Sequence, residues 1–231
     1  MPLLLNIDTA TEHASVCLSK DGTVLGLIEN SEQKNHASFL QPAIRELMAG
    51  SGCSLKEVDA IAVTAGPGSY TGLRVGLASA KGICFALDKP LVLVNTLEVM
   101  AQSIISHFQS LQPFTDPFPL LCPLIDARRM EVFTALYSLS LEEIEAPHAL
   151  IIDENAFSGP NYQRPIVFSG SGHLKLKGVF RHPNASYLHI QHNASHLAIR
   201  ALKAFQSGHF ANLAYAEPMY VKAFFDTSKK A

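Results

Sequence analysis

Two histidines near the C-terminal end of the chain have the spacing of a metal-binding pair. His192 and His196 are four residues apart at the start of a predicted helix, and His189 lies close by. Zinc proteases use this spacing, but the residue after their first histidine is a glutamate that acts as the base, and this chain has Asn193 there. Two interpretations stay open: a metal site, or solvated side chains beside a helix N-terminus.

A glycine-rich segment, GPGSYTGLRVG, occupies residues 66–76. It follows an apolar run and leads into a proline-free stretch, which predicts a strand, a tight turn and a helix with Ser69 or Thr71 as the N-cap. The amides of such a helix start could hold an anion. The alternative is a purely structural turn, in which glycine allows another backbone to come close. The glycines of this turn are Gly66, Gly68 and Gly72.

Nucleophilic catalysis finds little support. Ser69 does not lie in the Gly-x-Ser-x-Gly elbow of the hydrolases. The cysteines are far apart, mostly in apolar runs, and are expected to be buried free thiols of a reducing compartment. They are Cys17, Cys53, Cys84 and Cys122.

Composition limits the classes of protein. With 231 residues, 48% of them hydrophobic and 16% charged, the chain can bury a sizeable core. A net charge of -2 argues against a large generic phosphate-binding face. The apolar start is too short for a signal peptide, and no apolar run reaches the length of a membrane span. We therefore expect a soluble, cytoplasmic protein with no membrane partner.

The elements that would position these residues alternate between strands and helices. Three strands come first, the second and third joined by the turn signal Asp21-Gly22, and helices and strands then alternate up to a helix that Thr96 could cap. The predicted strands are 3–7, 15–19, 23–28, 60–65 and 91–94. The predicted helices are 37–48, 73–87 and 97–107.

A proline-rich segment at residues 112–119 marks the clearest break, because proline does not fit inside a helix or a central strand. Beyond it the order of elements repeats weakly. The expected strands are 120–125, 131–137 and 165–168, and the expected helices are 153–157 and 194–205. This pattern predicts an α/β fold of two lobes, 1–108 and 109–231, each a mixed sheet covered by helices. The last helix is a candidate to pack back on the first lobe.

Asp8-Thr9-Ala10-Thr11 and the glycine string together resemble the bacterial TsaB (YeaZ) family. Shorter matches follow in the same order along nearly the whole chain. They are Asn35-His36, Thr96-Leu97-Glu98, Asp126-Ala127-Arg128, Gly170-Ser171-Gly172 and Ala216-Glu217-Pro218-Met219-Tyr220. The resemblance implies the actin, hexokinase and Hsp70-like (ASKHA) fold. It also implies a non-catalytic relative of TsaD, in the machinery that makes threonylcarbamoyladenosine (t6A) on tRNA.

The resemblance marks several loops as vestiges of a nucleotide site. Their residues are Asp8, Thr9, Asp126, Gly170 and Gly172. Ala10 stands where phosphate-binding versions commonly have glycine, which limits the approach of a phosphate. The alternative is that these residues are turn formers and caps. We expect no tightly bound cofactor; ATP or ADP would bind only weakly or at a partner interface.

The metal centre of the catalytic relatives is the clearest departure. TsaD-like proteins carry two histidines after the strand that corresponds to residues 91–94, and the matching positions here are Thr96 and Met100. Neither is a comparable ligand. We therefore expect no metal and no catalytic residues.

The helix after the glycine turn carries two rows of small residues, and one row could meet the sheet while the other meets a neighbour. In the family, the helices that correspond to this one and to the predicted helix 37–48 pair with a second copy and with TsaD. The predicted partner surface comprises His36, Phe39, Ala43, Leu73, Gly76 and Ala80. The resemblance further implies a TsaE-like ATPase as a partner, a homodimer in isolation, and tRNA reached only through the complex.

Two functional hypotheses follow. One is a scaffold that binds a TsaD-like catalytic subunit. The other is an enzyme, either an ATP-dependent phosphotransferase or an M22-like metallopeptidase. The missing histidine pair argues against the peptidase, and Ala10 with no recognisable general base argues against the kinase.

Overall fold

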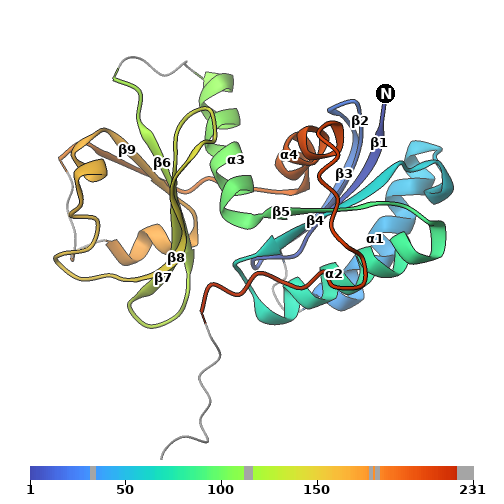
Figure 1. Cartoon of the computed structure of the whole chain (residues 1–231), viewed down its shortest axis with the longest axis horizontal. Coiled ribbons are helices and arrows are strands. Elements are labelled where there is room, and N and C mark those ends of the chain that lie inside the picture. The colour runs from blue at the N-terminus through green and yellow to red at the C-terminus, as the bar shows by residue number, and fades with distance from the viewer. Residues whose placement is uncertain (32–34, 112–116, 177–178, 180–182, 223–231) are drawn as a thin grey trace, which may run out of the picture.

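Two separate β-sheets form the centres of two lobes that lie side by side (Figure 1). The structure is a computed structural model that describes residues 1–31, 35–111, 117–176, 179 and 183–222. Most of the proline-rich segment lies outside these ranges, so the boundary between 108 and 109 stays a prediction. No helix in the described ranges combines the length and the hydropathy of a membrane span.

The first sheet has the strand order β3-β2-β1-β4-β5. Its strands are β1 (Leu3–Asp8), β2 (Ala14–Lys20), β3 (Thr23–Asn30), β4 (Ala60–Gly66) and β5 (Leu91–Asn95). The first three form an antiparallel meander, and β4 and β5 extend β1 in parallel. Asp21 and Gly22 turn between β2 and β3 with positive φ angles, as the hairpin signal predicts.

The second sheet repeats this plan with the order β8-β7-β6-β9-β10. Its strands are β6 (Leu120–Asp126), β7 (Glu131–Tyr137), β8 (Glu143–Ile151), β9 (Ile166–Ser169) and β10 (Ala185–Leu188). Here too an antiparallel meander precedes two strands added in parallel. The weak repeat in the sequence therefore corresponds to two lobes of one topology.

Helices cover both faces of the first sheet. The helices of the described ranges are α1 (His36–Ser51), α2 (Tyr70–Leu87), α3 (Thr96–Leu111) and α4 (Ala194–Gln206), of which α1, α2 and α4 cover this sheet. Leu40 of α1 and Leu77 of α2 pack with Leu5 on one face, whereas Leu197 of α4 packs with Leu4 and the other alternate residues on the opposite face. In the described part of the chain, three short 3-10 helices complete the elements: η1 (Leu55–Glu57), η2 (Pro160–Gln163) and η3 (Ser171–Leu176).

The two helices that follow the last strand of each sheet are exchanged between the lobes. In α3, Leu97 and Ile104 are buried against Leu121 and Ile125 of the second sheet. In α4, from the second half of the chain, the apolar face completes the core of the first sheet instead. Each sheet is therefore covered in part by a helix from the other half of the sequence.

Several predicted details are wrong. Residues 153–157 form a turn rather than a helix, and Phe157 has a φ of +58° that a helix does not allow. Strands β8 and β10 were not predicted. The side chain of Thr96 does not cap α3; Asn95 does, by accepting a hydrogen bond from the Leu97 amide at 2.8 Å.

Candidate functional site

The loop after β1 lies directly on the glycine turn at the start of α2. The Ser69 amide donates to the Ala10 carbonyl at 2.6 Å, and the Thr9 hydroxyl donates to the Gly72 carbonyl at 2.7 Å. A Cβ atom at Gly68 would clash with the Ala10 carbonyl, and one at Gly72 with the Thr9 carbonyl. Glycine at these positions therefore lets the two loops meet, which favours the structural interpretation of the turn over an anion site.

Ser69 is the N-cap of α2; the sequence predicted either Ser69 or Thr71 in this role. Its hydroxyl accepts a hydrogen bond from the Gly72 amide at 3.3 Å. Two amides at the helix start therefore already donate within the chain: the Ser69 amide to the Ala10 carbonyl and the Gly72 amide to the Ser69 hydroxyl.

The carboxylate of Asp8 is fully buried and held by its own lobe. Its Oδ1 accepts from the Thr64 hydroxyl at 2.9 Å and from the Ala10 amide at 3.1 Å. Its Oδ2 lies 3.3 Å from Nε2 of the buried His192, which the chain supplies just before α4. Asp8, predicted as part of a vestigial nucleotide loop, thus contacts His192, which was predicted as part of a separate histidine group.

The other two histidines of the group make local contacts. His196 Nδ1 accepts from the Asn193 amide at 3.2 Å and completes a capping box at the start of α4. Burial, followed by the neighbouring His192, lowers the pKa of His196 to about 4. His189 packs its ring on His173, with centroids 5.6 Å apart. Within the described ranges, no three His, Cys, Asp or Glu side chains gather as a metal site.

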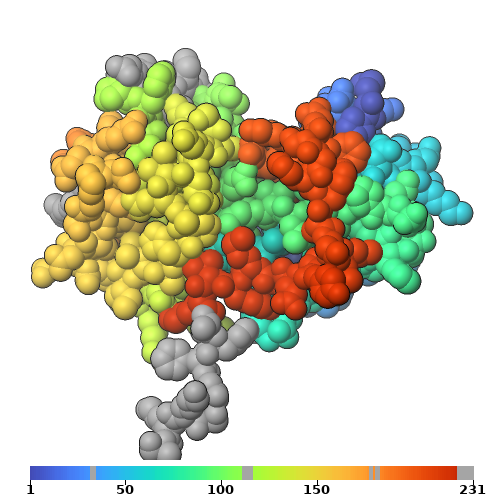
Figure 2. Space-filling model, viewed as in Figure 1, coloured from blue at the N-terminus to red at the C-terminus, as the bar shows by residue number. Residues whose placement is uncertain are grey.

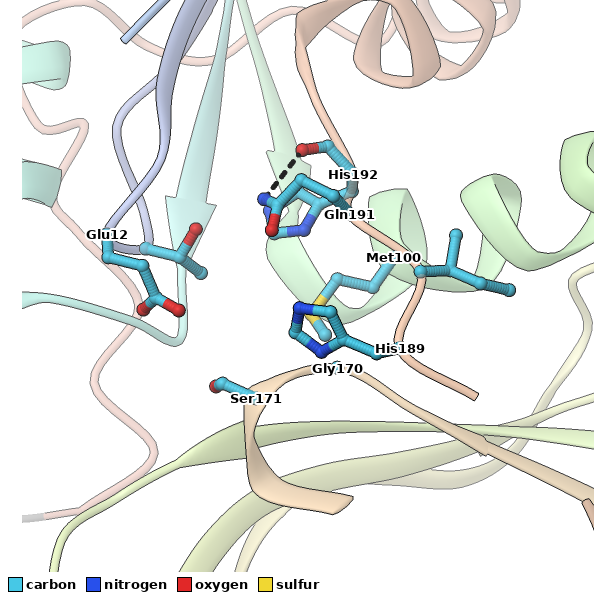
Figure 3. Close-up of a pocket in the computed structure, with 9 residues that line it drawn as sticks. Glu12, Met100, Gly170, Ser171, His189, Gln191 and His192 are labelled. Atoms are coloured by element: carbon cyan, nitrogen blue, oxygen red, sulfur yellow. Dashed lines mark hydrogen bonds between the residues drawn. The ribbon is translucent and has the colours of Figure 1, made fainter. Parts of the chain in front are cut away.

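A small pocket lies between His192 and Gly170 of the second lobe (Figure 3). Its cavity volume is about 10 Å³, which suits a single water molecule. Met100 of α3 points into it, and its methyl group lies directly against Gly170, where a Cβ atom would clash. The space between the lobes is therefore filled here by the chain itself.

The predicted loops of the second lobe also bond within the chain. The Ser171 hydroxyl accepts from the Asp126 amide at 3.1 Å, while Asp126 Oδ1 accepts from Lys175 Nζ at 2.6 Å. Gly170 and Gly172 pack on the Leu124 backbone, where a side chain would not fit. The predicted residues Asp126, Gly170 and Gly172 thus lie close together, and their contacts are with other residues of the chain.

The tip of the β6–β7 hairpin has an unusual backbone. Arg128 and Arg129 have φ angles of +67° and +47°, and both side chains are exposed. The left-handed region costs a non-glycine residue about 1–2 kcal/mol. Arg128 belongs to the Asp126-Ala127-Arg128 loop match, and Arg129 is not part of any match. Adjacent arginines in a hairpin with no glycine are the signal that could have identified them.

None of the cysteines is placed as a nucleophile. Cys17, Cys84 and Cys122 are buried free thiols, and Cys53 is a partly buried one. Burial raises the pKa of Cys17 and Cys122 to about 12 and that of Cys84 to about 11. These three thiols are therefore unreactive at neutral pH, as predicted from their apolar surroundings.

Comparison with known proteins gives the relatives of this arrangement. A family model described as TsaD, tRNA N6-adenosine threonylcarbamoyltransferase, matches residues 23–223. The tRNA threonylcarbamoyladenosine biosynthesis protein TsaB of Bacillus subtilis (strain 168) is 30% identical over 170 residues, which make up 72% of this chain and 70% of that protein. YeaZ from Pseudomonas aeruginosa superposes with a TM-score of 0.81 at 27% identity, over 95% of this chain and 100% of that one. The chain belongs to the TsaB (YeaZ) family.

A more distant structure shows the fold alone. The activator of 2-hydroxyisocaproyl-CoA dehydratase from Clostridium difficile, solved with bound ADPNP, has a TM-score of 0.50 at 8% identity, over 89% of this chain and 96% of that one. The predicted ASKHA fold with two related lobes is confirmed. Against some other curated relatives the chain spans only about half of their length.

The two positions that the resemblance matches to a histidine pair lie in the interior. Thr96 and Met100 are buried, at 0% and 3% exposure, and face the interior. Met100 packs with Leu97 and Ile104 in the core beneath the second sheet. A hydroxyl and a thioether in these places do not fit a metal centre.

Most of the predicted partner surface is buried in the single chain, and its role as a partner contact stays a prediction. His36, Ala43, Leu73, Gly76 and Ala80 are buried within the chain, and only Phe39 is half-buried. Spacing alone revealed two rows of small residues on α2 but not which row meets the sheet.

The other row of α2 faces outward. Ala78, Gly82 and Ala86 are exposed, and Phe85 beside them is 83% exposed. Together with residues of α1 and η1, the small residues line a shallow groove. We call Ala78, Gly82, Phe85 and Ala86 the outer face of α2.

A segment after α4 was not predicted to have a role. Residues 207–222, the C-terminal strap, run back along α2 and reach the second lobe (Figure 2). Lys81 Nζ donates to the Ala216 carbonyl at 3.0 Å, and the Met219 amide donates to the Ala65 carbonyl at 2.6 Å. Lys222 then pairs with Glu131 of β7 at 2.8 Å, so the strap joins the two lobes.

Proposed function

We propose that the chain is a non-catalytic subunit of the cytoplasmic machinery that makes t6A on tRNA, where it binds and supports a TsaD-like catalytic subunit. The observation that carries the proposal is the filled space between the lobes. In ASKHA enzymes this region does the chemistry, whereas here Met100 packs on Gly170, and Asp8 accepts hydrogen bonds from Ala10 and from Thr64 of β4. The name of the Bacillus subtilis relative supplies the pathway.

We propose that no nucleotide or metal binds tightly at the pocket between the lobes. A cavity of about 10 Å³ has no room for an adenosine phosphate. Weak binding of ATP or ADP is proposed only for a surface shared with a partner. Neither a phosphotransferase nor a metallopeptidase is favoured by any contact described above.

The outer face of α2 is the proposed contact for the TsaD-like subunit, and for a second copy of the chain when the subunit is absent. Small exposed residues allow another helix to approach closely, and Phe85 supplies an exposed apolar side chain beside them. A TsaE-like ATPase would join the assembled pair, and tRNA would be bound by the complex.

A paired substitution tests this proposal. Phe85→Glu and Ala78→Glu each place a carboxylate on the outer face of α2, and should abolish co-elution with the TsaD-like subunit and t6A synthesis by the reconstituted mixture. Ile151→Glu, which changes a side chain 65% exposed at the end of β8, is the matched control. Wild-type assembly by both α2 variants would refute the surface, and t6A synthesis without the chain would refute the function.

A further inference from the structure

The tip of the β6–β7 hairpin carries two cations that no anion in the described part of the chain neutralises. Arg128 and Arg129 are adjacent and exposed, and none of the hydrogen bonds or ion pairs found in the described ranges engages their guanidinium groups. Met130, the next residue, is 43% exposed. Their left-handed backbone is unfavourable for arginine, and strained backbone of this kind clusters at binding sites.

The hairpin is held rigidly from both sides. Asp126 Oδ1 accepts from the Arg128 amide at 2.7 Å and from Lys175 Nζ at 2.6 Å. Glu131, at the other end of the tip, is paired with Lys222 of the strap at 2.8 Å. The two carboxylates are thus compensated by the two lysines, and the charge of the two arginines is left over.

Aromatic side chains lie along the strap that leads to this hairpin. Tyr220, two residues before Lys222, packs on Tyr70 with ring centroids 5.7 Å apart. Arg74 Nε donates to the Tyr220 hydroxyl at 3.1 Å, and its guanidinium carbon lies 3.9 Å from the centroid of the Tyr70 ring. Both tyrosines remain exposed, at 42% for Tyr70 and 38% for Tyr220.

We propose that this surface, formed by the arginine hairpin and the tyrosine cluster, binds a short stretch of RNA directly. The arginines would hold phosphates, for which the planar guanidinium fork is suited, and the tyrosines would stack unpaired bases. We call it the RNA surface: Arg128, Arg129, Arg74, Tyr70 and Tyr220. The inference rests on the proposed function, which supplies tRNA as the substrate of the complex, and adds that this subunit itself contacts the RNA.

An RNA is favoured over an acidic protein because cations and exposed aromatic rings occur together. Carboxylates would use the arginines but would gain nothing from partly exposed tyrosine rings, whereas bases stack on such rings irrespective of sequence. The rest of the chain is not basic, since its net charge is -2. The contact therefore adds to the affinity of the complex for RNA and gives the isolated chain only weak affinity for RNA.

The test measures binding of an unmodified anticodon stem-loop RNA at several salt concentrations, both to the assembled complex and to the isolated chain. Arg128→Gln/Arg129→Gln should reduce the slope of log affinity against log salt by about 1.4, because each single-strand phosphate contact contributes about 0.7. Affinity should fall about tenfold at moderate salt. Tyr220→Leu should weaken binding and leave the salt slope as in the wild type, because stacking releases no counterions.

Two controls make the outcome decisive. Arg164→Gln removes one arginine charge from an exposed site before β9, at the opposite end of the second sheet, and should bind like the wild type. Arg128→Gly/Arg129→Gly relieves the strain of the left-handed backbone, so this variant should lose RNA affinity without a lower melting temperature. An unchanged salt slope in both arginine variants would overturn the proposal. The proposal would also fail if these variants lost binding to a polyglutamate peptide as much as binding to RNA, because that result would identify a surface for acidic proteins.

The same samples separate this proposal from the proposed function. Co-elution of the wild-type chain with the TsaD-like subunit tests the function. RNA binding by the isolated chain tests the RNA surface even where co-elution fails.

Discussion

Single glycines of α2 differ sharply in what surrounds them. A Cβ atom at Gly72 would strike the Thr9 carbonyl, whereas one at Gly82 would find nothing within 4 Å. The same residue type, ten positions apart on one helix, is therefore required in one place and only tolerated in the other.

This contrast predicts opposite effects of one substitution. Gly72→Ala should lower the free energy of unfolding by about 1–3 kcal/mol, because the β1–β2 loop must move away from α2. Gly82→Ala should raise it by about 1 kcal/mol, since alanine is the better helix former. Urea unfolding of the two variants checks this. Shifts in the same direction would show that the loop does not press on Gly72.

His196 makes stability depend on pH. Its pKa is about 4 in the folded chain, against an ordinary value of 6.5, so between these values the unfolded chain binds the extra proton. Stability from this group is intact above pH 6.5 and falls as the pH drops toward 4, by up to about 3 kcal/mol.

The variant His196→Gln should flatten that part of the profile. Glutamine can still accept the Asn193 amide in a capping box, so stability at pH 7 should change little. Thermal unfolding between pH 7 and 4.5 measures the difference. His209→Gln, at an exposed position, should keep the wild-type slope; a matching slope in His196→Gln would rule out this histidine as the source.

At this scale the sequence predicts the caps and turns best. Ser69 and the Asp21-Gly22 turn follow from residue type and position, because capping and turn formation are local. The contact of His192 with Asp8 joins residues far apart in the chain, and no local pattern contains it.

Among the elements, the C-terminal strap depends on one lysine of α2. Lys81 Nζ donates to the carbonyls of Ala214 and Ala216, at 3.3 and 3.0 Å. Lys81→Met removes both hydrogen bonds but keeps the aliphatic stem. Amide exchange in residues 211–222 should become about tenfold faster, because a hydrogen bond to a charged group contributes about 1.5 kcal/mol.

Hydrogen exchange read by mass spectrometry measures this change. Lys203→Met, on the exposed side of α4, is the control and should leave the strap protected. If the strap of Lys81→Met stays as protected as in the wild type, its attachment rests on other contacts, such as the pairing of Lys222 with Glu131.

The elements that the sequence failed to predict share one property. Strand β8 is half-exposed along most of its length and contains Pro147, so it shows neither an apolar run nor clear alternation. Strand β10 has four residues, none of them fully buried, so it lacks the apolar run that marks the equally short β9. Both lie at an edge of the second sheet, where burial constrains sequence least.

For the whole molecule, the two lobes meet through α3 and the filled pocket. Met100→Ala should cost about 2–5 kcal/mol of unfolding free energy, the usual range for a buried methionine, because its side chain packs against Gly170 and the core below. Met130→Ala, at a 43% exposed position, should stay within about 0.5 kcal/mol of the wild type. Denaturant unfolding distinguishes the two. Equal, small losses would indicate that the lobes do not depend on this contact.

The two-lobed plan itself could be predicted, because strand-then-helix order and a proline-rich break are visible in one sequence. The exchange of α3 and α4 could not, since hydrophobic spacing shows that a helix has an apolar face but not which sheet that face covers.

That exchange sets an order of events during synthesis. The apolar face formed by Leu4, Ala60 and Val92 is covered by α4, which is translated long after β5. At about 5–20 residues per second, the ribosome leaves that face without its helix for roughly 5–20 s. Nascent chains arrested before residue 194 should therefore be digested by protease and bound by chaperones, whereas chains with α4 outside the exit tunnel should resist. Early resistance would mean that the first lobe closes before its last helix is made.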